Sequence, residues 1–157
     1  MSYCQFIAGL EAGVQAEHRS YHDERYGFPI ANDNELFGRL LLEINQAGLS
    51  WTTILKKEAN FRKAYHGFSI QKIAGYTHRD KERLLADAGI IRNRLKIEAA
   101  IYNAQAVLAL QQQYGSFQQW LQHHHPLPLA AWMKLFKATF RFTGGQIVNE
   151  FLMSTGY

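Results

Sequence analysis

Apolar residues recur at helical spacing between positions 36 and 44, and a glycine and a serine follow closely. This spacing predicts an amphipathic helix with one apolar stripe. Asn32 followed by Glu35 resembles a capping box at its start. Gly48 can end a helix, and Ser50 can cap the next one. The segment therefore predicts two helices joined by a short turn. The stripe consists of Leu36, Phe37, Leu40, Leu41 and Ile44.

An acidic and an aromatic residue lie close to this turn. Glu43 falls on the edge of the apolar stripe, and Trp51 opens the second helix. An acid at the margin of a core beside a large π-face suits a pocket for a flat, electron-poor ligand. The alternative is a Glu43 that reaches water and a Trp51 in the core, and composition alone favours this alternative.

The rest of the chain repeats the pattern of capping residues followed by apolar helical stretches. Ser69, Thr77 with Asp80, and Ser116 each predict the start of a short helix. The run of three histidines followed by prolines at 123–128 predicts a loop. No segment shows the alternation of a strand, so the predicted fold is all-α in a single domain over residues 1–157. The expected helices span about 33–46, 51–64, 69–73, 77–86, 90–110, 116–121, 129–138 and a last segment after 145, with a short helix and irregular segments in 1–31.

Composition limits the class of protein and its surroundings. Apolar residues make up 47% of the 157 residues and charged residues 19%, which is typical of a globular chain. The net charge of +4 favours an anionic partner. The single cysteine, Cys4, excludes an internal disulfide and is typical of a reducing cytoplasm. The sequence shows no signal peptide and no membrane span, so we expect a cytoplasmic protein, and a monomer suffices.

Residues 84–97 predict a hairpin between two helices. Gly89 lies at its centre, and Arg92, Arg94 and Lys96 follow at the start of the second helix. Exposed amides at a helix N-terminus bind phosphate, and the three cations would attract a nucleic-acid backbone. The alternative is an ordinary helical hairpin with solvated charges.

Two residues near the N-terminus are candidate metal ligands. Cys4 and His22 are possible soft-metal ligands, but a closed zinc site needs four. Two ligands do not make a site. The adjacent histidines at 123–125 would diverge in a loop, so ordered metal binding there is not expected.

Three of these segments, in this order and spacing, resemble the DNA-3-methyladenine glycosylase I family, a branch of the helix–hairpin–helix DNA glycosylases. The resemblance implies an all-α helix–hairpin–helix fold and hydrolysis of the N-glycosidic bond of 3-methyladenine in alkylated double-stranded DNA, with free 3-methyladenine as product. It covers residues 21 to about 102 closely and the remainder less closely. The matching segments are Tyr21-His22-Asp23-Glu24, Gln46-Ala47-Gly48-Leu49-Ser50-Trp51 with Ile54-Leu55-Lys56-Lys57, and Asp87-Ala88-Gly89-Ile90-Ile91-Arg92.

The resemblance also implies roles for individual residues. Glu43 would accept hydrogen bonds from the flipped base, and Trp51 and Tyr21 would enclose its face. Phe6 stands where the family has an aromatic that completes the pocket. Leu49 would fill the gap left in the duplex. The hairpin residues expected to hold the phosphate backbone are Gly89, Ile91, Arg92, Arg94 and Lys96.

The sequence also departs from the family pattern. Arg25-Tyr26 replaces a Glu-Trp pair, and Asn149 stands where the family favours an aromatic. The family's structural zinc takes a Cys and a His from a tail beyond the last helix, and this chain stops at Tyr157. Either the chain as given lacks the tail, or this relative lacks the zinc that Cys4 and His22 would begin to bind.

Two alternative functions belong to other classes. The first is a non-catalytic helix–hairpin–helix module that binds DNA or senses damage, in which Arg92 and Arg94 carry the function. The second is a helical enzyme acting on free nucleobases or nucleosides. Release of base from methylated DNA distinguishes the glycosylase from both.

Overall fold

A computed structural model of the protein describes residues 32–46 and 50–157, and all regular structure in them is helical. This confirms the predicted all-α class for the described part. The elements are α3 (Asp33–Gln46), α4 (Trp51–Ala64), the 3-10 turn η1 (His66–Phe68), α5 (Ile70–Ala74), α6 (His78–Leu85), α7 (Arg94–Tyr114), α8 (Phe117–His124), α9 (Leu129–Thr139) and α10 (Gly145–Ser154). None of these helices is long and apolar enough to cross a membrane.

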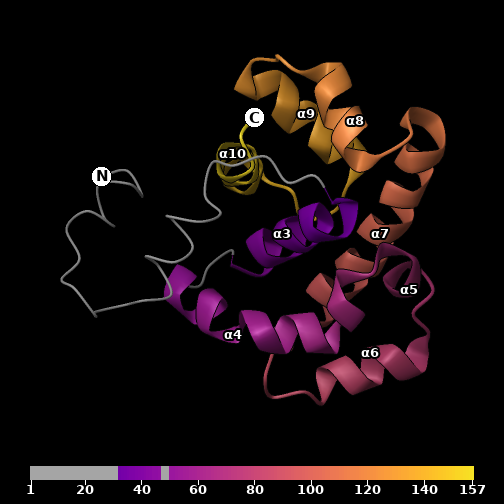
Figure 1. The fold of residues 1–157 in the computed structure, drawn as a ribbon. Helices are drawn as coiled ribbons and strands as arrows, with labels where there is room; N and C mark the ends of the chain where they lie inside the picture. The colour runs from indigo at the N-terminus through magenta and orange to yellow at the C-terminus, as the bar shows by residue number, and fades with distance from the viewer. Residues whose placement is uncertain (1–31, 47–49) are drawn as a thin grey trace.

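Helix α3 lies in the middle of the assembly of helices (Figure 1). It contacts α4, α7, α8 and α10, and every residue from 36 to 45 is buried. The predicted helix and the burial of its apolar stripe are confirmed. The expectation of an exposed polar face was wrong, because neighbouring helices also cover the polar residues of α3. Its polar residues Arg39, Glu43 and Asn45 are enclosed with the apolar ones.

The predicted capping residues do begin the helices. The side chains of Ser50, Ser69 and Ser116 each accept a hydrogen bond from the backbone N–H three residues further on. Thr77 and Asp80 form the predicted capping box of α6. These contacts join residues close in sequence, which is why the sequence predicts them.

The capping contact expected at the start of α3 is present. The side chain of Asn32 accepts from the N–H of Glu35 at 3.2 Å. The Glu35 carboxylate also accepts a bidentate pair of hydrogen bonds from Arg62 on α4, with N–O distances of 2.5 and 2.9 Å. This pair joins the start of α3 to the end of α4.

Asp33 joins the start of α3 to α7 and α8. Its carboxylate accepts from the N–H of Phe117 at 2.8 Å and from that of Gln118 at 3.2 Å. It also accepts from the side chain of Gln111 on α7 at 2.8 Å. A carboxylate suits this place because the first N–H groups of α8 have no partner within their own helix.

The long helix begins later than predicted. The expected start near residue 90 was wrong, because Ile90 to Asn93 form the second half of the hairpin and α7 begins at Arg94. The side chain of Asn93 accepts from the N–H of Lys96 at 3.1 Å and so fixes this start. Asn93 is therefore the capping residue.

The loop predicted at the histidine run also begins later, because His123 and His124 form the last turn of α8. Their rings pack against Tyr114 of α7, with centroids 5.2 and 6.0 Å away. His125 lies instead against Tyr157, at 5.8 Å. Aromatic packing thus accounts for this run.

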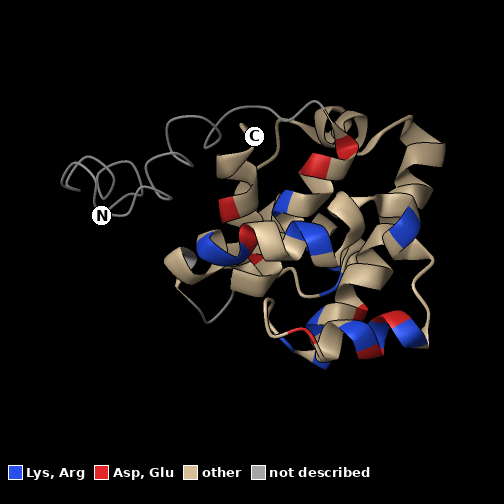
Figure 2. Cartoon of the chain, turned by 60° about the horizontal axis from the view of Figure 1, so that its bottom comes forward, with Lys and Arg blue, Asp and Glu red and all other residues tan. Residues whose placement is uncertain are grey.

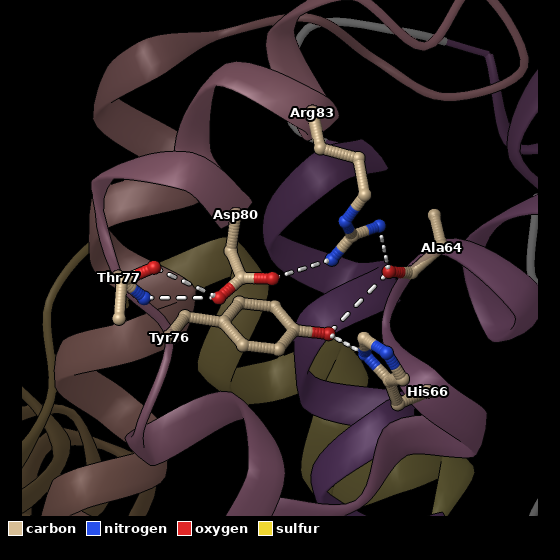
Figure 3. A network of polar contacts seen from close by, with 6 residues as sticks. All are labelled: Ala64, His66, Tyr76, Thr77, Asp80 and Arg83. Atoms are coloured by element: carbon tan, nitrogen blue, oxygen red, sulfur yellow. Dashed lines mark hydrogen bonds and ion pairs between the residues drawn. The ribbon is translucent and has the colours of Figure 1, made fainter.

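A polar network ties α6 to the end of α4 (Figure 3). The guanidinium of Arg83 donates to the carbonyl of Ala64 at 2.8 Å and lies 3.3 Å from the Asp80 carboxylate. The hydroxyl of Tyr76 reaches the same carbonyl at 3.4 Å and lies 2.6 Å from the Nδ1 atom of His66. The network satisfies a terminal carbonyl of α4 and places the hairpin that follows α6 beside α4.

Candidate active site and DNA-binding surface

Glu43 lies one turn before the end of α3 and is almost entirely buried. Its exposed fraction is 1%, and neither carboxylate oxygen has a hydrogen-bond partner in the part of the chain that the structure describes. The prediction that Glu43 lies at the edge of the core was wrong in degree, because α3 is covered on that side too. A buried carboxylate without partners is costly, so it indicates a functional role.

Two charged residues act on Glu43. Burial is the main reason that the pKa of Glu43 lies well above its usual range, and repulsion from Glu150 on α10 raises it further. Arg39, one turn earlier on α3, acts in the opposite direction. Helices α3 and α10, which carry Glu43 and Glu150, are in contact. A buried carboxylate whose pKa is raised in this way would be stabilised by a cationic ligand.

The hairpin between α6 and α7 packs against α4. The N–H of Gly89 donates to the side chain of Asp87 at 2.8 Å, which closes the turn. A β-carbon on Gly89 would lie 3.1 Å from the side chain of Asn60 on α4, tighter than ordinary contact. Ile90 is buried and Ile91 is half-buried, so the two isoleucines anchor the hairpin in the core.

The three predicted phosphate-binding cations lie in different surroundings. Arg92 in the hairpin and Arg94 at the start of α7 are exposed, and Arg94 lies 3.7 Å from the carboxylate of Glu82. Lys96 is only 9% exposed, and its ammonium lies 3.4 Å from the carbonyl oxygen of Asn45 on α3. The geometry therefore favours a phosphate role for the two arginines and a different role for Lys96.

Helix α6 itself is not a simple basic surface. It carries lysine, arginine and acidic residues along the same helix (Figure 2). Much of the charge there is internally compensated, as in the ion pair of Arg83 with Asp80 at 3.3 Å. The exposed arginines that follow the hairpin are the better candidates for DNA contact.

Several predicted site residues lie outside the described residues. These are the candidate metal ligands, two of the aromatic pocket residues and the residue expected to fill the gap in the duplex. For Trp51 only the backbone, which starts α4, is described. The residues outside are Cys4, Phe6, Tyr21, His22 and Leu49.

The described part of the chain contains no metal site of its own. Within residues 32–46 and 50–157, no group of three or more His, Cys, Asp or Glu side chains could hold a metal ion. The residues that follow α10, Thr155 to Tyr157, contain neither His nor Cys. A zinc site therefore has no described ligand set.

Sequence reasoning missed Arg39 and Glu150 as neighbours of Glu43. Arg39 lies four residues before Glu43, which places both on one face of the helix, so its spacing was a usable signal. Glu150 lies on α10, more than 100 residues further along the chain, and no local pattern connects it with Glu43.

Comparison with known proteins agrees with this arrangement of a buried acid, a helical hairpin and an all-α fold. The profile of the methyladenine glycosylase family matches residues 12–134, and the chain belongs to this family. DNA-3-methyladenine glycosylase 1 of Escherichia coli (strain K12) is 37% identical over 156 residues, covering 87% of this chain and 83% of that protein. DNA-3-methyladenine glycosylase of Haemophilus influenzae is 38% identical over 118 residues, covering 73% of this chain and 64% of that protein.

A solved structure extends the similarity to the whole fold. It is that of a tyrosine-to-phenylalanine variant of 3-methyladenine DNA glycosylase I in complex with 3-methyladenine. The TM-score is 0.84 at 31% sequence identity, and the match covers 99% of this chain and 91% of that one. The predicted helix–hairpin–helix glycosylase-like fold is thereby confirmed.

Proposed function

We propose that the protein hydrolyses the N-glycosidic bond of 3-methyladenine in alkylated double-stranded DNA, with Glu43 as the residue that binds the flipped base. The names of its relatives support the activity and the lesion. The observation that carries the role of Glu43 is its burial with both carboxylate oxygens unpartnered by any described group. A base entering the site would supply the missing donors.

Cleavage of this glycosidic bond requires little catalytic assistance from the protein. Methylation at N3 makes adenine cationic in DNA and a good leaving group, so recognition of the flipped base supplies much of the selectivity. The Glu43 carboxylate accepts hydrogen bonds from the base and stabilises its positive charge in a water-poor site. Water is the nucleophile, and its oxygen bonds to the sugar C1′ as the C1′–N9 bond breaks. The cationic base takes the glycosidic electrons and leaves as neutral 3-methyladenine, and the attacking water loses a proton to solvent.

The remaining parts of the site come from the aromatic residues and the hairpin. Tyr21, Trp51 and Phe6 enclose the base, and Leu49 fills its place in the duplex. Arg92 and Arg94 bind the phosphate backbone of the DNA. The protein acts as a monomer. Cys4 and His22 are the candidate ligands of a structural zinc, and the reaction steps above use protein groups and water.

The test is release of free base from methylated duplex DNA by wild type, Glu43→Gln and Glu98→Gln. Glu98 is a half-buried acid on α7, and it is not among the charges that shift the pKa of Glu43, so its variant makes the same charge change without acting on that group. We expect 3-methyladenine release by wild type and Glu98→Gln, and a loss of about 100-fold or more in Glu43→Gln. Duplex affinity should remain similar in all three.

Two results would contradict the proposal. Absence of base release from folded wild type that still binds DNA would identify a DNA-binding relative without the chemistry. Full activity in Glu43→Gln would remove Glu43 from the pocket.

A further inference from the structure

Lys96 is placed differently from the other cations of the hairpin. It is 9% exposed, and its ammonium lies 3.4 Å from the carbonyl oxygen of Asn45, 51 residues earlier in the chain. Burial lowers its pKa. An ammonium held inside the protein in this way is poorly placed to neutralise a phosphate, which requires an exposed charge.

The end of α3 offers a reason for this placement. The last carbonyls of a helix have no partner within it, and the helix dipole places negative charge there. The last turn of α3, Glu43 to Gln46, contains no basic residue. Lys96 therefore supplies from α7 the positive charge that α3 lacks at this end.

Lys96 is also fixed at its own backbone. Its N–H donates to the side chain of Asn93, the residue that ends the hairpin and caps α7. One residue thus connects the end of the hairpin to a carbonyl two positions beyond Glu43. In the sequence, Asn45 precedes Leu49 by four residues.

The side chain of Lys96 is also surrounded along its length by residues of α3 and α7. Together with Asn45 and Asn103 it lines a cavity of about 10 Å³ between α3 and α7. The apolar part of the lining comes from the core faces of the two helices, at Phe37, Leu40, Leu41, Ile44 and Ala100. A space of this size holds at most about one water molecule, so Lys96 packs closely against the residues of α3 and α7 that line it.

We infer that Lys96 is a positioning residue, which connects the DNA-binding hairpin to the end of α3 and holds Glu43 in register with DNA bound at the hairpin. This inference rests on the proposed glycosylase function. It replaces the phosphate contact predicted for Lys96 from the sequence. The role requires the positive charge of Lys96, because the ammonium contacts the Asn45 carbonyl. It also requires the length of the side chain, because that side chain must reach from α7 to α3.

The experiment compares Lys96→Met with Arg92→Met, using the full chain and methylated duplex DNA. Methionine keeps an unbranched apolar stem and removes the charge in both variants. For each protein we would measure the single-turnover rate of base release at saturating DNA, and duplex affinity as a function of salt concentration. Circular dichroism and thermal unfolding would establish that each variant is folded.

We expect the two variants to differ in the saturated rate and in the salt dependence of affinity. In Lys96→Met the saturated rate falls by about 10- to 100-fold because Glu43 is misplaced, while the slope of log affinity against log salt stays that of wild type. In Arg92→Met the affinity falls and the magnitude of the slope decreases by about one. Lys96→Arg, which keeps the charge, should recover part of the rate that Lys96→Met loses.

Other results would overturn the inference. A reduced salt slope in Lys96→Met would show a phosphate contact, and a wild-type rate at saturation would show that the contact to Asn45 does not act on the site. If Lys96→Met does not fold, Lys96→Gln gives the same two readouts with a polar side chain. Inactive wild type would contradict the proposed function itself, so the two failures are distinguishable.

Discussion

Glu43 on α3 and Glu150 on α10 are acids from helices in contact, and the charge of Glu150 raises the pKa of Glu43 beyond the effect of burial. Like charges held near each other oppose folding unless a cation joins them. Arg39 on α3 partly offsets them. On α7, the ammonium of Lys96 contacts the backbone carbonyl of Asn45. A cationic ligand close to Glu43 would relieve the repulsion that raises its pKa.

The first prediction concerns the stability of the free protein. Because the pKa of Glu43 is raised on folding, its contribution is favourable below the unfolded value of about 4.3 and is lost as pH rises through the folded value. Glu43→Gln, which resembles the protonated form, should be more stable than wild type at neutral pH, by about 1–3 kcal/mol. Urea unfolding at several pH values measures this. The difference should vanish near pH 4, and a variant less stable than wild type at pH 7 would contradict it.

The second prediction concerns the pH dependence of base release. Glu150→Gln removes the repulsion, so the pKa of Glu43 should fall and the acid limb of the rate profile should move to lower pH. Glu98→Gln has the same effect on net charge, and its acid limb should stay in place. Rate profiles of the two variants and wild type provide the measurement. A shift toward higher pH in Glu150→Gln, or equal shifts in both variants, would argue against coupling between the two acids.

The third prediction concerns the packing of α3 on the turn after α4. A β-carbon on Gly38 would lie 2.3 Å from the ring of Phe68, which is buried. Gly38→Ala should lower the free energy of unfolding by about 1–3 kcal/mol despite the better helix propensity of alanine. Gly75→Ala, whose β-carbon would approach nothing closer than 3.7 Å, is the control and should change stability by less than about 0.5 kcal/mol. Equal stabilities of the two variants would show that Phe68 can move aside.

The fourth prediction concerns the start of α8. Asp33→Ala removes the acceptor of the Phe117 and Gln118 N–H groups and should cost about 1–2 kcal/mol. Hydrogen exchange should accelerate at these two amides more than at the amides of α6, because α6 keeps its own capping box. Uniform acceleration across all helices would indicate global destabilisation instead.

The parts of the structure that the sequence predicts are those decided by neighbouring residues. Ser69 and Ser116 begin helices because a hydroxyl three residues before an N–H suffices to cap it. The complete burial of Glu43 depends on α10, far along the chain, and no periodicity in α3 contains that information. The contact of Lys96 was not predictable for the same reason, since its partner at Asn45 lies on another helix. The family resemblance suggested Glu43 as the pocket acid, but the charges around Glu43 could be found only from the fold.

The position of α3 has a consequence for synthesis of the protein. This helix leaves the ribosome early, but the helices that enclose it follow later, and α10 comes last among the described elements. A helix whose residues 36 to 45 are all buried in the finished fold must therefore stay exposed, or find temporary cover, until residue 154 has emerged. Translation that pauses between α7 and α10 should increase the demand for chaperones, because the half-made chain presents this helix with one side uncovered.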